Sequence, residues 1–361
     1  MQNLVELYLK IRSPREGIGK TWDRNSTINR QFIMADLSAE QIVKVFTAKV
    51  DFSIDGFVAW KECQELIKPA TDWLSQHYPK VVFSPISKYF NSEVVADGLS
   101  VNHCQMNIIR SIIDDFKNLS TCKSIIEIGP GYGALPREIL LKNDKIKYVV
   151  IDLPESIICS YSYLNLEFPN KNHLVLTSEE DTKKDFDILY VPVKFLDLFL
   201  KSKMITQFDL FINTCSMGEM TNDIVRNYYN IVTNVLDVKS VYWLNRFLDN
   251  GSQTENSNAC MVEIPKKWHI KHWKRIPTFM QCPYVMTHHA KYVELYADIQ
   301  KTEDSIEKEV DSDDLLFYLW NVNRLQPNRN SLLKIINEIE NILPTAVELV
   351  YYRNLLKTLT T

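Results

Sequence analysis

Three of the chain's nine glycines fall within five positions, in the stretch SIIEIGPGYG at residues 124–133. The apolar run SIIEI comes directly before them, and ALPREILLK, which has helical composition, comes directly after. Glycine lets a backbone turn with positive φ and lets another group approach where a Cβ would stand. The cluster of Gly129, Gly131 and Gly133 therefore predicts a tight strand-to-helix turn whose backbone N–H groups face a ligand.

The region from about residue 122 to 300 alternates between strand-like and helix-like patterns. Short apolar runs that predict strands occupy residues 123–129, 146–154, 185–192, 208–214 and 241–247. Apolar stripes with helical spacing occupy residues 134–142, 155–168 and 223–236. Such alternation is typical of an α/β protein with a parallel, Rossmann-like sheet.

The flanking regions are helical by pattern, so the chain divides into three predicted parts. Residues 1–115 form a helical N-terminal region, a candidate lid or dimer surface, and residues 116–300 form the ligand-binding domain. Residues 301–361 form C-terminal helices that follow a strongly charged segment, KTEDSIEKEVDS. These terminal helices carry no polar cluster suited to catalysis, and they are candidates for homo-oligomer formation.

Charge and cysteine usage exclude several classes of protein. The formal net charge is −4 and the pI about 6.0, so no global positive field gathers nucleic acid, and we expect no nucleic-acid partner. The seven cysteines are scattered singly without C-x-x-C pairs, which argues against a disulfide framework or a zinc ribbon. No secretory signal and no apolar run of membrane-spanning length are recognisable, so we expect a cytoplasmic protein without a membrane span.

Two carboxylates decide which ligand suits the glycine turn. The pattern Gly129-x-Gly131-x-x-Ala134 satisfies the dinucleotide fingerprint, which NAD enzymes also use. Glu127, however, ends the first strand, where it would repel a pyrophosphate but could pair with a cationic ammonium group. Asp152 ends the next strand, 21 residues after Gly131, where it can accept both ribose hydroxyls. An acidic cradle of this kind favours S-adenosyl-L-methionine over NAD.

The pattern E-x-G-x-G-x-G followed by an acidic second-strand end resembles class I S-adenosylmethionine-dependent methyltransferases. More narrowly, IDLPE at 151–155, NTCSMGEM at 213–220 and NRF at 245–247 resemble a family of sugar O-methyltransferases found near bacterial surface-polysaccharide genes. The resemblance spans about residues 120–250. It implies a Rossmann-like class I sheet in which Glu127, Gly129, Gly131 and Gly133 hold the methionine end of the cofactor, Asp152 holds the ribose, and Leu153 packs on the adenine or ribose. The predicted cofactor-binding set also includes Tyr132 in the turn and three residues of the loop after residue 212, Asn213, Ser216 and Met217, of which Asn213 and Ser216 could orient either the cofactor or the acceptor.

Transfer of a methyl group to a sugar hydroxyl requires alignment of the acceptor oxygen and removal of its proton. The loop CSMGEM follows a strand whose carboxyl end borders the ligand crevice, so Glu219 is a candidate base, although it could instead cap the next helix. Arg246 is a candidate for acceptor recognition or for a structural ion pair. His288 and His289 are rival bases.

The stretch KKWHIKHWKRI at 266–276 is the most basic in the chain and interleaves two tryptophans. It suits a phosphorylated or nucleotide-linked sugar, or nucleic acid, or simply a strand that packs its tryptophans. His269 and His272 lie three positions apart, but no H-x-x-x-H helix or acidic ligand set accompanies them. We therefore expect no metal site.

The sequence thus favours an S-adenosylmethionine-dependent O-methyltransferase that acts on a sugar hydroxyl of a glycan or nucleotide-linked precursor. Three alternatives stay open at this point. An NAD-linked oxidoreductase could use the same glycine turn. A nucleic-acid methyltransferase could use the basic stretch, but the N/D-P-P-Y/F tetrad of such enzymes is replaced here by NTCSMGEM. A non-catalytic protein could bind the cofactor within an assembly.

Overall fold

The computed structural model describes residues 3–12, 29–51, 60–248, 263–276, 291–299, 315–342, 344 and 348–359. The chain divides into two compact units. The N-terminal unit contains the described residues up to Asp209, and the C-terminal unit contains those from Leu210 onward. The predicted three-part division at residues 115 and 300 stays a prediction.

The N-terminal unit combines short buried strands with most of the helices. Its strands are β1 (Ser124–Ile128), β2 (Lys147–Asp152), β3 (His173–Val175), β4 (Ile188–Pro192) and β5 (Gln207–Phe208). Its helices are α1 (Leu4–Ile11), α3 (Ala39–Asp51), α4 (Trp60–His77), α5 (Val101–Lys117), α6 (Ala134–Lys142), α7 (Pro154–Glu167) and α8 (Leu196–Ser202).

The C-terminal unit has longer strands and a group of helices at the end of the chain. Its strands are β6 (Leu210–Thr214), β7 (Asp237–Val238), β8 (Ser240–Leu248), β9 (Trp268–Ile276) and β10 (Lys291–Ile299). Its helices are α9 (Asn222–Asn230), α11 (Leu315–Leu325), α12 (Arg329–Ile342) and α13 (Glu348–Thr358).

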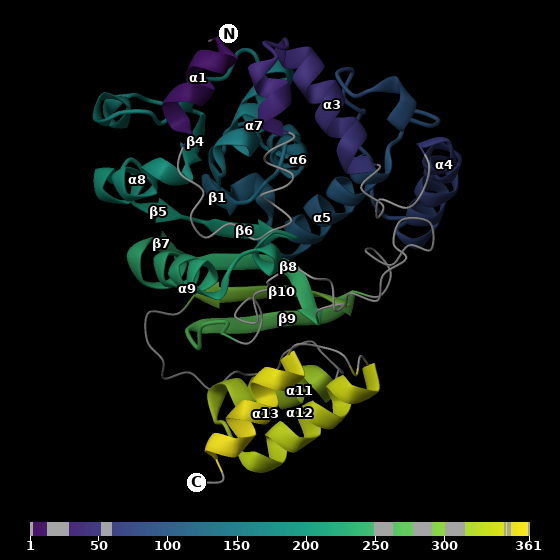
Figure 1. Cartoon of the computed structure of the whole chain (residues 1–361), viewed down its shortest axis with the longest axis vertical. Helices are drawn as coiled ribbons and strands as arrows, with labels where there is room; N and C mark the ends of the chain where they lie inside the picture. Colours follow the sequence, from purple (N-terminus) through teal and green to yellow (C-terminus); the bar gives the residue numbers. More distant parts are fainter. Residues whose placement is uncertain are drawn as a thin grey trace. The chain divides into compact units, whose positions relative to one another are not determined.

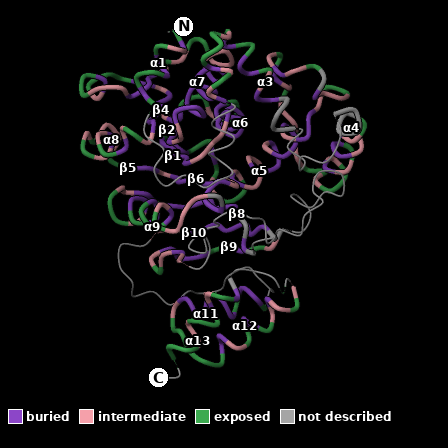
Figure 2. The backbone as a smooth tube through the Cα atoms, in the orientation of Figure 1, coloured by how far each residue is buried: buried purple, intermediate pink, exposed green. Residues whose placement is uncertain are grey.

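The strand order is β3-β4-β2-β1 in the N-terminal unit and β6-β8-β10-β9 in the C-terminal unit. Within the N-terminal unit, β3, β4, β2 and β1 are parallel, and Glu127 of β1 lies opposite Val150 of β2. Every residue of β1 and β4 is buried (Figure 2). Burial on both faces explains why these strands are continuous apolar runs without alternation.

In the C-terminal unit the last strand in sequence lies between two others. β6 and β8 are parallel, whereas β10 is antiparallel both to β8 and to β9. The strand that comes last in the sequence, β10, is thus inserted between β8 and β9 with reversed direction. The predicted Rossmann-like α/β fold class is confirmed, but the sequence patterns predicted only a parallel sheet and missed the antiparallel insertion of β10.

Helix predictions were mostly confirmed, with two differences. The predicted helix over 223–236 ends as α-helix at Asn230 and continues as a π-helical turn over Ile231–Val235. The sequence analysis did not predict α11, which follows the charged segment and packs against α12. The structure places α11, α12 and α13 together within the C-terminal unit (Figure 1). No helix among the described residues has the length and apolar character required to cross a membrane.

Gly133 provides a test of the glycine turn because two constraints act on it together. Its φ is +95°, and an added Cβ would lie 3.2 Å from two carbons of Leu164 on α7. Gly98 has φ +75° with nothing within 4 Å of such a Cβ. We predict that Gly98→Ala costs about 1 kcal/mol of unfolding free energy through backbone strain, and that Gly133→Ala costs roughly 1 to 2 kcal/mol more.

Urea denaturation of the two variants measures this difference. Gly98→Ala is the matched control for positive φ without a steric neighbour. Equal losses of stability in both variants would contradict the claim that α7 packs too closely for a side chain at position 133.

Candidate functional site

Glu127 lies at the carboxyl end of β1 with no exposed surface. One of its oxygens, Oε2, accepts a 2.6 Å hydrogen bond from the hydroxyl of Tyr148 on the neighbouring strand β2. The other oxygen, Oε1, is buried and has no hydrogen-bond partner among the described residues. An unpartnered buried polar atom is costly, so it indicates a group that a ligand satisfies.

Burial dominates the electrostatics of this carboxylate. Burial, with a smaller contribution from the nearby Asp152, raises the pKa of Glu127 to about 8, although the hydrogen bond from the Tyr148 hydroxyl acts in the opposite direction. In the described part of the chain, no cationic side chain forms an ion pair with Glu127 or Asp152. A cationic ligand group would therefore supply the missing charge.

The glycine turn follows Glu127 directly. Gly129, Gly131 and Gly133 all have positive φ, at 73°, 62° and 95°. The Gly129 N–H donates to the carbonyl of Ile151 at 2.9 Å, which ties the turn to the end of β2. Apart from Gly131 and its two chain neighbours, no atom of the described residues lies within 4 Å of the place where a Cβ on Gly131 would stand.

Asp152 joins the turn to helix α7. Its Oδ2 accepts the Gly131 N–H at 3.2 Å, and its Oδ1 accepts the Leu153 N–H at 2.7 Å. Burial raises the pKa of Asp152 to about 7, although these two hydrogen bonds and one from Ser156 oppose the shift. Asp152 and Leu153 both keep part of their surface accessible, unlike Glu127. The acid is thus placed to accept hydroxyl donors from a ligand beside the turn.

Tyr132 is buried within the turn and packs against aromatic side chains. Its ring contacts Phe90 and Tyr163 edge to face, with centroid separations of 6.1 and 5.3 Å. Its hydroxyl donates to Asn102 on α5. These contacts indicate that Tyr132 holds the shape of the turn, and its predicted contact with a cofactor stays a prediction.

A polar cluster that the sequence analysis missed lies next to Asp152. Glu155, in the first turn of α7, accepts a 2.8 Å hydrogen bond from the hydroxyl of Tyr8 on α1. Arg30 donates to the Tyr8 hydroxyl at 2.9 Å and lies 3.5 Å from Glu155. Burial and Glu155 raise the pKa of Tyr8. The motif IDLPE contains Glu155, but its partners lie more than a hundred residues away, so no local pattern could identify them.

In the C-terminal unit, the loop after β6 is held by amide side chains. Asn213 donates to the hydroxyl of Ser216 at 2.6 Å and accepts the Met217 N–H at 3.3 Å. Asn245 on β8 donates to Asn213 at 2.8 Å and accepts the Gly218 N–H at 3.3 Å. Asn213 and Met217 have no exposed surface. These hydrogen bonds fix the loop, and the cofactor contacts predicted for Asn213, Ser216 and Met217 stay predictions.

The predicted catalytic residues lie largely outside what the structure describes. Helical backbone is assigned at Glu219 and strand backbone at Arg246, but neither side chain is described. His288 and His289 fall outside the described residues. Their roles stay predictions.

The basic stretch at 266–276 contains strand β9, and its tryptophans are packed. Trp268 and Trp273 are at most 1% exposed, and Trp268 donates to Thr233 at 2.9 Å. His272 lies 3.3 Å from Glu294, which also accepts the Tyr242 hydroxyl. Among the described residues, no group of three or more His, Cys, Asp or Glu side chains has an arrangement that could hold a metal ion.

Comparison with protein-family models finds no match. The chain is 37% identical over 87 residues to the ribosomal RNA small subunit methyltransferase A of Sulfurihydrogenibium sp., which covers 22% of this chain and 33% of that protein. It is 27% identical over 162 residues to the protein of the same name from Mycoplasma mycoides, covering 40% and 56%. The chain therefore spans between a third and just over half of these curated relatives.

Several solved structures are similar to parts of this chain. One is M. capricolum TrmK in complex with S-adenosyl-homocysteine, with 18% identity, a TM-score of 0.36, and coverage of 74% of this chain and 96% of that one. Another is the magnesium protoporphyrin IX methyltransferase of Synechocystis PCC 6803 with bound SAH, with 8% identity, a TM-score of 0.36, and coverage of 57% and 90%.

The raised pKa of Glu127 makes the stability of the ligand-free protein depend on pH. The folded state holds the proton up to about pH 8, whereas the unfolded carboxyl loses it near the ordinary value of 4.5. The stabilising contribution is therefore complete below 4.5 and is lost as the pH rises through about 8. Glu127→Gln removes this dependence, because the amide stays neutral and can still accept from Tyr148.

We predict that the variant gains stability relative to the wild type between about pH 6 and about pH 9. Urea midpoints of both proteins at the two pH values measure this change. Leu141→Gln, at an exposed position on α6, is a control without a titrating carboxyl. A constant difference between wild type and Glu127→Gln across this range would contradict a buried, raised-pKa carboxyl.

Proposed function

We propose that this chain is an S-adenosylmethionine-dependent methyltransferase. The observation that carries the proposal is the buried Glu127 carboxylate, whose Oε1 has no partner among the described residues and which lies beside a second acid, Asp152. A ligand with a cationic amino-acid group and a ribose, but no phosphate, matches this pair of acids at a glycine turn. The cofactor is S-adenosyl-L-methionine.

The residues of the turn divide the recognition of this cofactor among them. Glu127 would hold the ammonium group, and the backbone of the three glycines would border the methionine portion. Asp152 would accept the ribose hydroxyls, and Leu153, which is partly accessible, would pack against the adenosine. The cofactor supplies a methyl group on a cationic sulfur, which a nucleophilic acceptor can attack.

Access to Glu127 imposes a condition on binding. Because the residue has no exposed surface, an incoming ammonium group must displace atoms now packed over the carboxylate. Burial favours the protonated form of Glu127 in the ligand-free protein. When the ligand binds, Glu127 loses this proton and its carboxylate pairs with the ammonium group. The site therefore binds its cofactor best where Glu127 is ionised and the ligand amine is still protonated.

An NAD-linked oxidoreductase fits these residues less well. A pyrophosphate beside Glu127 and Asp152 would place negative charges next to two acids without a cationic side chain between them. The dinucleotide fingerprint alone does not separate the two cofactors. The unpartnered Oε1 of Glu127 favours S-adenosylmethionine over NAD, because a carboxylate attracts an ammonium group and repels a phosphate.

For the acceptor, we propose a hydroxyl group of a sugar in a glycan or nucleotide-linked precursor. The motifs IDLPE, NTCSMGEM and NRF support this choice, and the N/D-P-P-Y/F tetrad of base-directed enzymes does not follow β6. A sugar hydroxyl needs a base to take its proton. Glu219, His288 and His289 are the candidates for that role, and Arg246 is the candidate for recognition of an acidic group on the acceptor.

RNA is the second candidate acceptor because the curated relatives are named ribosomal RNA methyltransferases. Those matches cover at most 40% of this chain. The formal net charge of −4 weighs against a long polyanionic acceptor. The third alternative, a non-catalytic cofactor-binding protein, predicts binding without transfer.

Cofactor affinity provides the first test. S-adenosylhomocysteine should raise the melting temperature of the wild-type protein, whereas NAD should not. Asp152→Ala should weaken S-adenosylhomocysteine binding by roughly 10- to 100-fold, since hydrogen bonds to a charged group are lost. Isothermal titration calorimetry measures both ligands, with Asp144→Ala on the exposed loop after α6 as the control. Stabilisation by NAD alone, or an unchanged dissociation constant in Asp152→Ala, would defeat the proposal.

Methyl transfer provides the second test. Protein supplied with radiolabelled S-adenosylmethionine should label nucleotide sugars or surface polysaccharide, and leave ribosomal and transfer RNA unlabelled. Glu127→Gln should lower the rate at limiting cofactor by roughly 10-fold or more because the ammonium loses its charged partner. Label in RNA but not in carbohydrate would replace the sugar acceptor by RNA. Cofactor binding without label in any acceptor would favour the non-catalytic alternative.

A further inference from the structure

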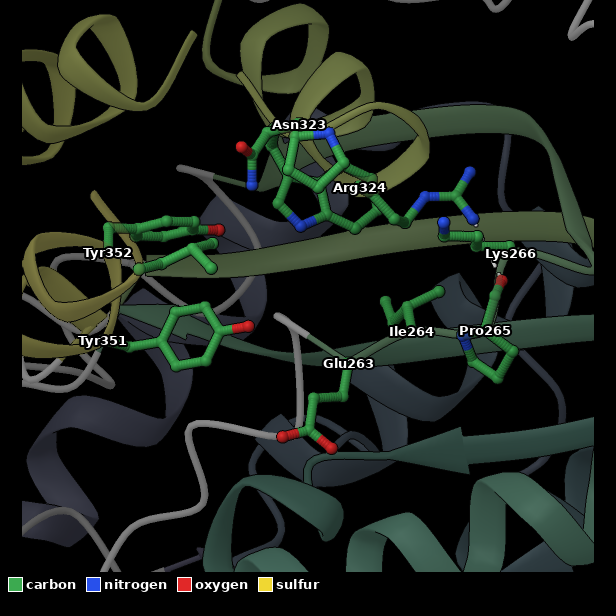
Figure 3. Close-up of a pocket in the computed structure, with 11 residues that line it drawn as sticks. Glu263, Ile264, Pro265, Lys266, Asn323, Arg324, Tyr351 and Tyr352 are labelled. Carbon is green, nitrogen blue, oxygen red and sulfur yellow. Dashed lines mark hydrogen bonds between the residues drawn. The ribbon is translucent and has the colours of Figure 1, made fainter. Parts of the chain in front are cut away.

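A cavity in the C-terminal unit is lined by residues that are not assigned to the cofactor or the acceptor. Its volume is about 350 Å³, within the range of small-molecule sites. Residues 263–266, which precede β9, line one side, and α11 and α13 supply the others. Figure 3 shows Tyr351 and Tyr352 reaching into the cavity from α13, with Asn323 of α11 beside them.

Aromatic rings form much of the wall. Tyr351 and Tyr352 have ring centroids 5.3 Å apart and planes at 82°, so they present surfaces in two directions. Trp320 of α11 also lines the cavity. Aromatic faces carry partial negative charge and attract the weakly positive C–H groups of a saturated ring. A ligand with an apolar C–H face would pack well on these walls.

The charged groups in the wall already have partners, and Lys266 Nζ donates to the Leu325 carbonyl at 3.4 Å. Arg324 donates to the Pro265 carbonyl at 2.9 Å and to Asn321 Oδ1 at 2.7 and 3.0 Å. Glu263 receives two hydrogen bonds from Arg226, at 2.5 and 2.6 Å. An ionic ligand would have to compete with these pairs. The cavity is therefore better suited to a neutral ligand.

Two neutral polar atoms in the wall remain unsatisfied. Asn323 is 6% exposed and Trp320 is 1% exposed. The Asn323 Oδ1 acceptor and the Trp320 Nε1 donor are both buried, and neither has a partner among the described residues. A buried donor or acceptor left unpaired is unfavourable, so both atoms would gain from a hydrogen-bonding ligand. Hydroxyl groups both donate and accept, so a polyhydroxylated ligand can satisfy an acceptor and a donor together.

We propose that this cavity binds a neutral saccharide unit. A pyranose ring has an apolar face of C–H groups for the tyrosine and tryptophan rings. Its hydroxyls would pair with the Asn323 oxygen and the Trp320 N–H after displacing the atoms now packed over them. This site goes beyond the proposed methyl transfer and does not depend on it, because none of its residues belongs to the glycine turn or the loop after β6.

Saturation-transfer NMR on the full chain tests the site with maltose, lactose and chitobiose as probes. We expect at least one probe to bind with a dissociation constant on the order of 1 mM, with the strongest transfer to its ring C–H protons. Asn323→Leu should weaken that binding by roughly 10-fold. Tyr351→Ala should weaken saccharide binding by a similar factor. Because Tyr351 is only half-buried, this substitution disturbs folding less than one at a fully buried position.

Tyr318→Ala is the matched control, because Tyr318 lies on the same helix α11, is 64% exposed and does not line the cavity. Thermal melting establishes that each variant is folded. Glu127→Gln should leave saccharide binding unchanged while it weakens S-adenosylhomocysteine binding, which separates this site from the proposed function.

Three outcomes would overturn the saccharide site. One is the absence of transfer to all three probes with folded protein. Another is binding that Asn323→Leu and Tyr351→Ala leave unchanged, which would place the sugar elsewhere. The third is competition by uridine diphosphate with no binding of uncharged sugars, which would show that the wall selects an anion.

Discussion

Burial of the Glu127 carboxylate without a cationic side chain is the constraint on which the proposed function depends. A single buried acid could be neutralised by a proton, and the raised pKa shows that the ligand-free protein tends toward that state. The proximity of Asp152 increases the cost of ionising both groups. A chain that uses two adjacent acids in this way gains binding energy from a cationic ligand at the expense of its own ligand-free stability.

The surrounding fold keeps these two acids at fixed positions. The parallel pairing of β1 and β2 places Tyr148 beside Glu127, and the glycine turn binds back to Ile151 and Asp152. The N-terminal helix α1 is tied to the same region through Tyr8 and Glu155, next to the start of α7. Helix α1 therefore supports the region around the acidic site.

The loop after β6 is held in one conformation by its own side chains. The amides of Asn213 and Asn245 bind each other and the backbone of residues 217 and 218, so they hold the loop in one conformation. Cys215 adopts a positive φ of 55° within this loop, which indicates a backbone that is held under constraint. A loop that is fixed by its own side chains can present the neighbouring residues to a ligand without further ordering.

The sequence by itself determined the elements and the acidic character of the turn. Continuous apolar runs bounded by polar residues predicted β1, β2, β4, β6 and β8, because strands buried on both faces leave a signal that needs no partner. Local spacing also placed Glu127, the three glycines and Asp152 at adjoining strand ends. Only the tertiary structure decided which groups satisfy one another: the Tyr148 bond that leaves one Glu127 oxygen unpartnered, the link from Tyr8 to Glu155, the insertion of β10, and the cavity beside α11 and α13. These features arise from contacts between segments far apart in the chain, and hydrophobic periodicity carries no information about such pairs.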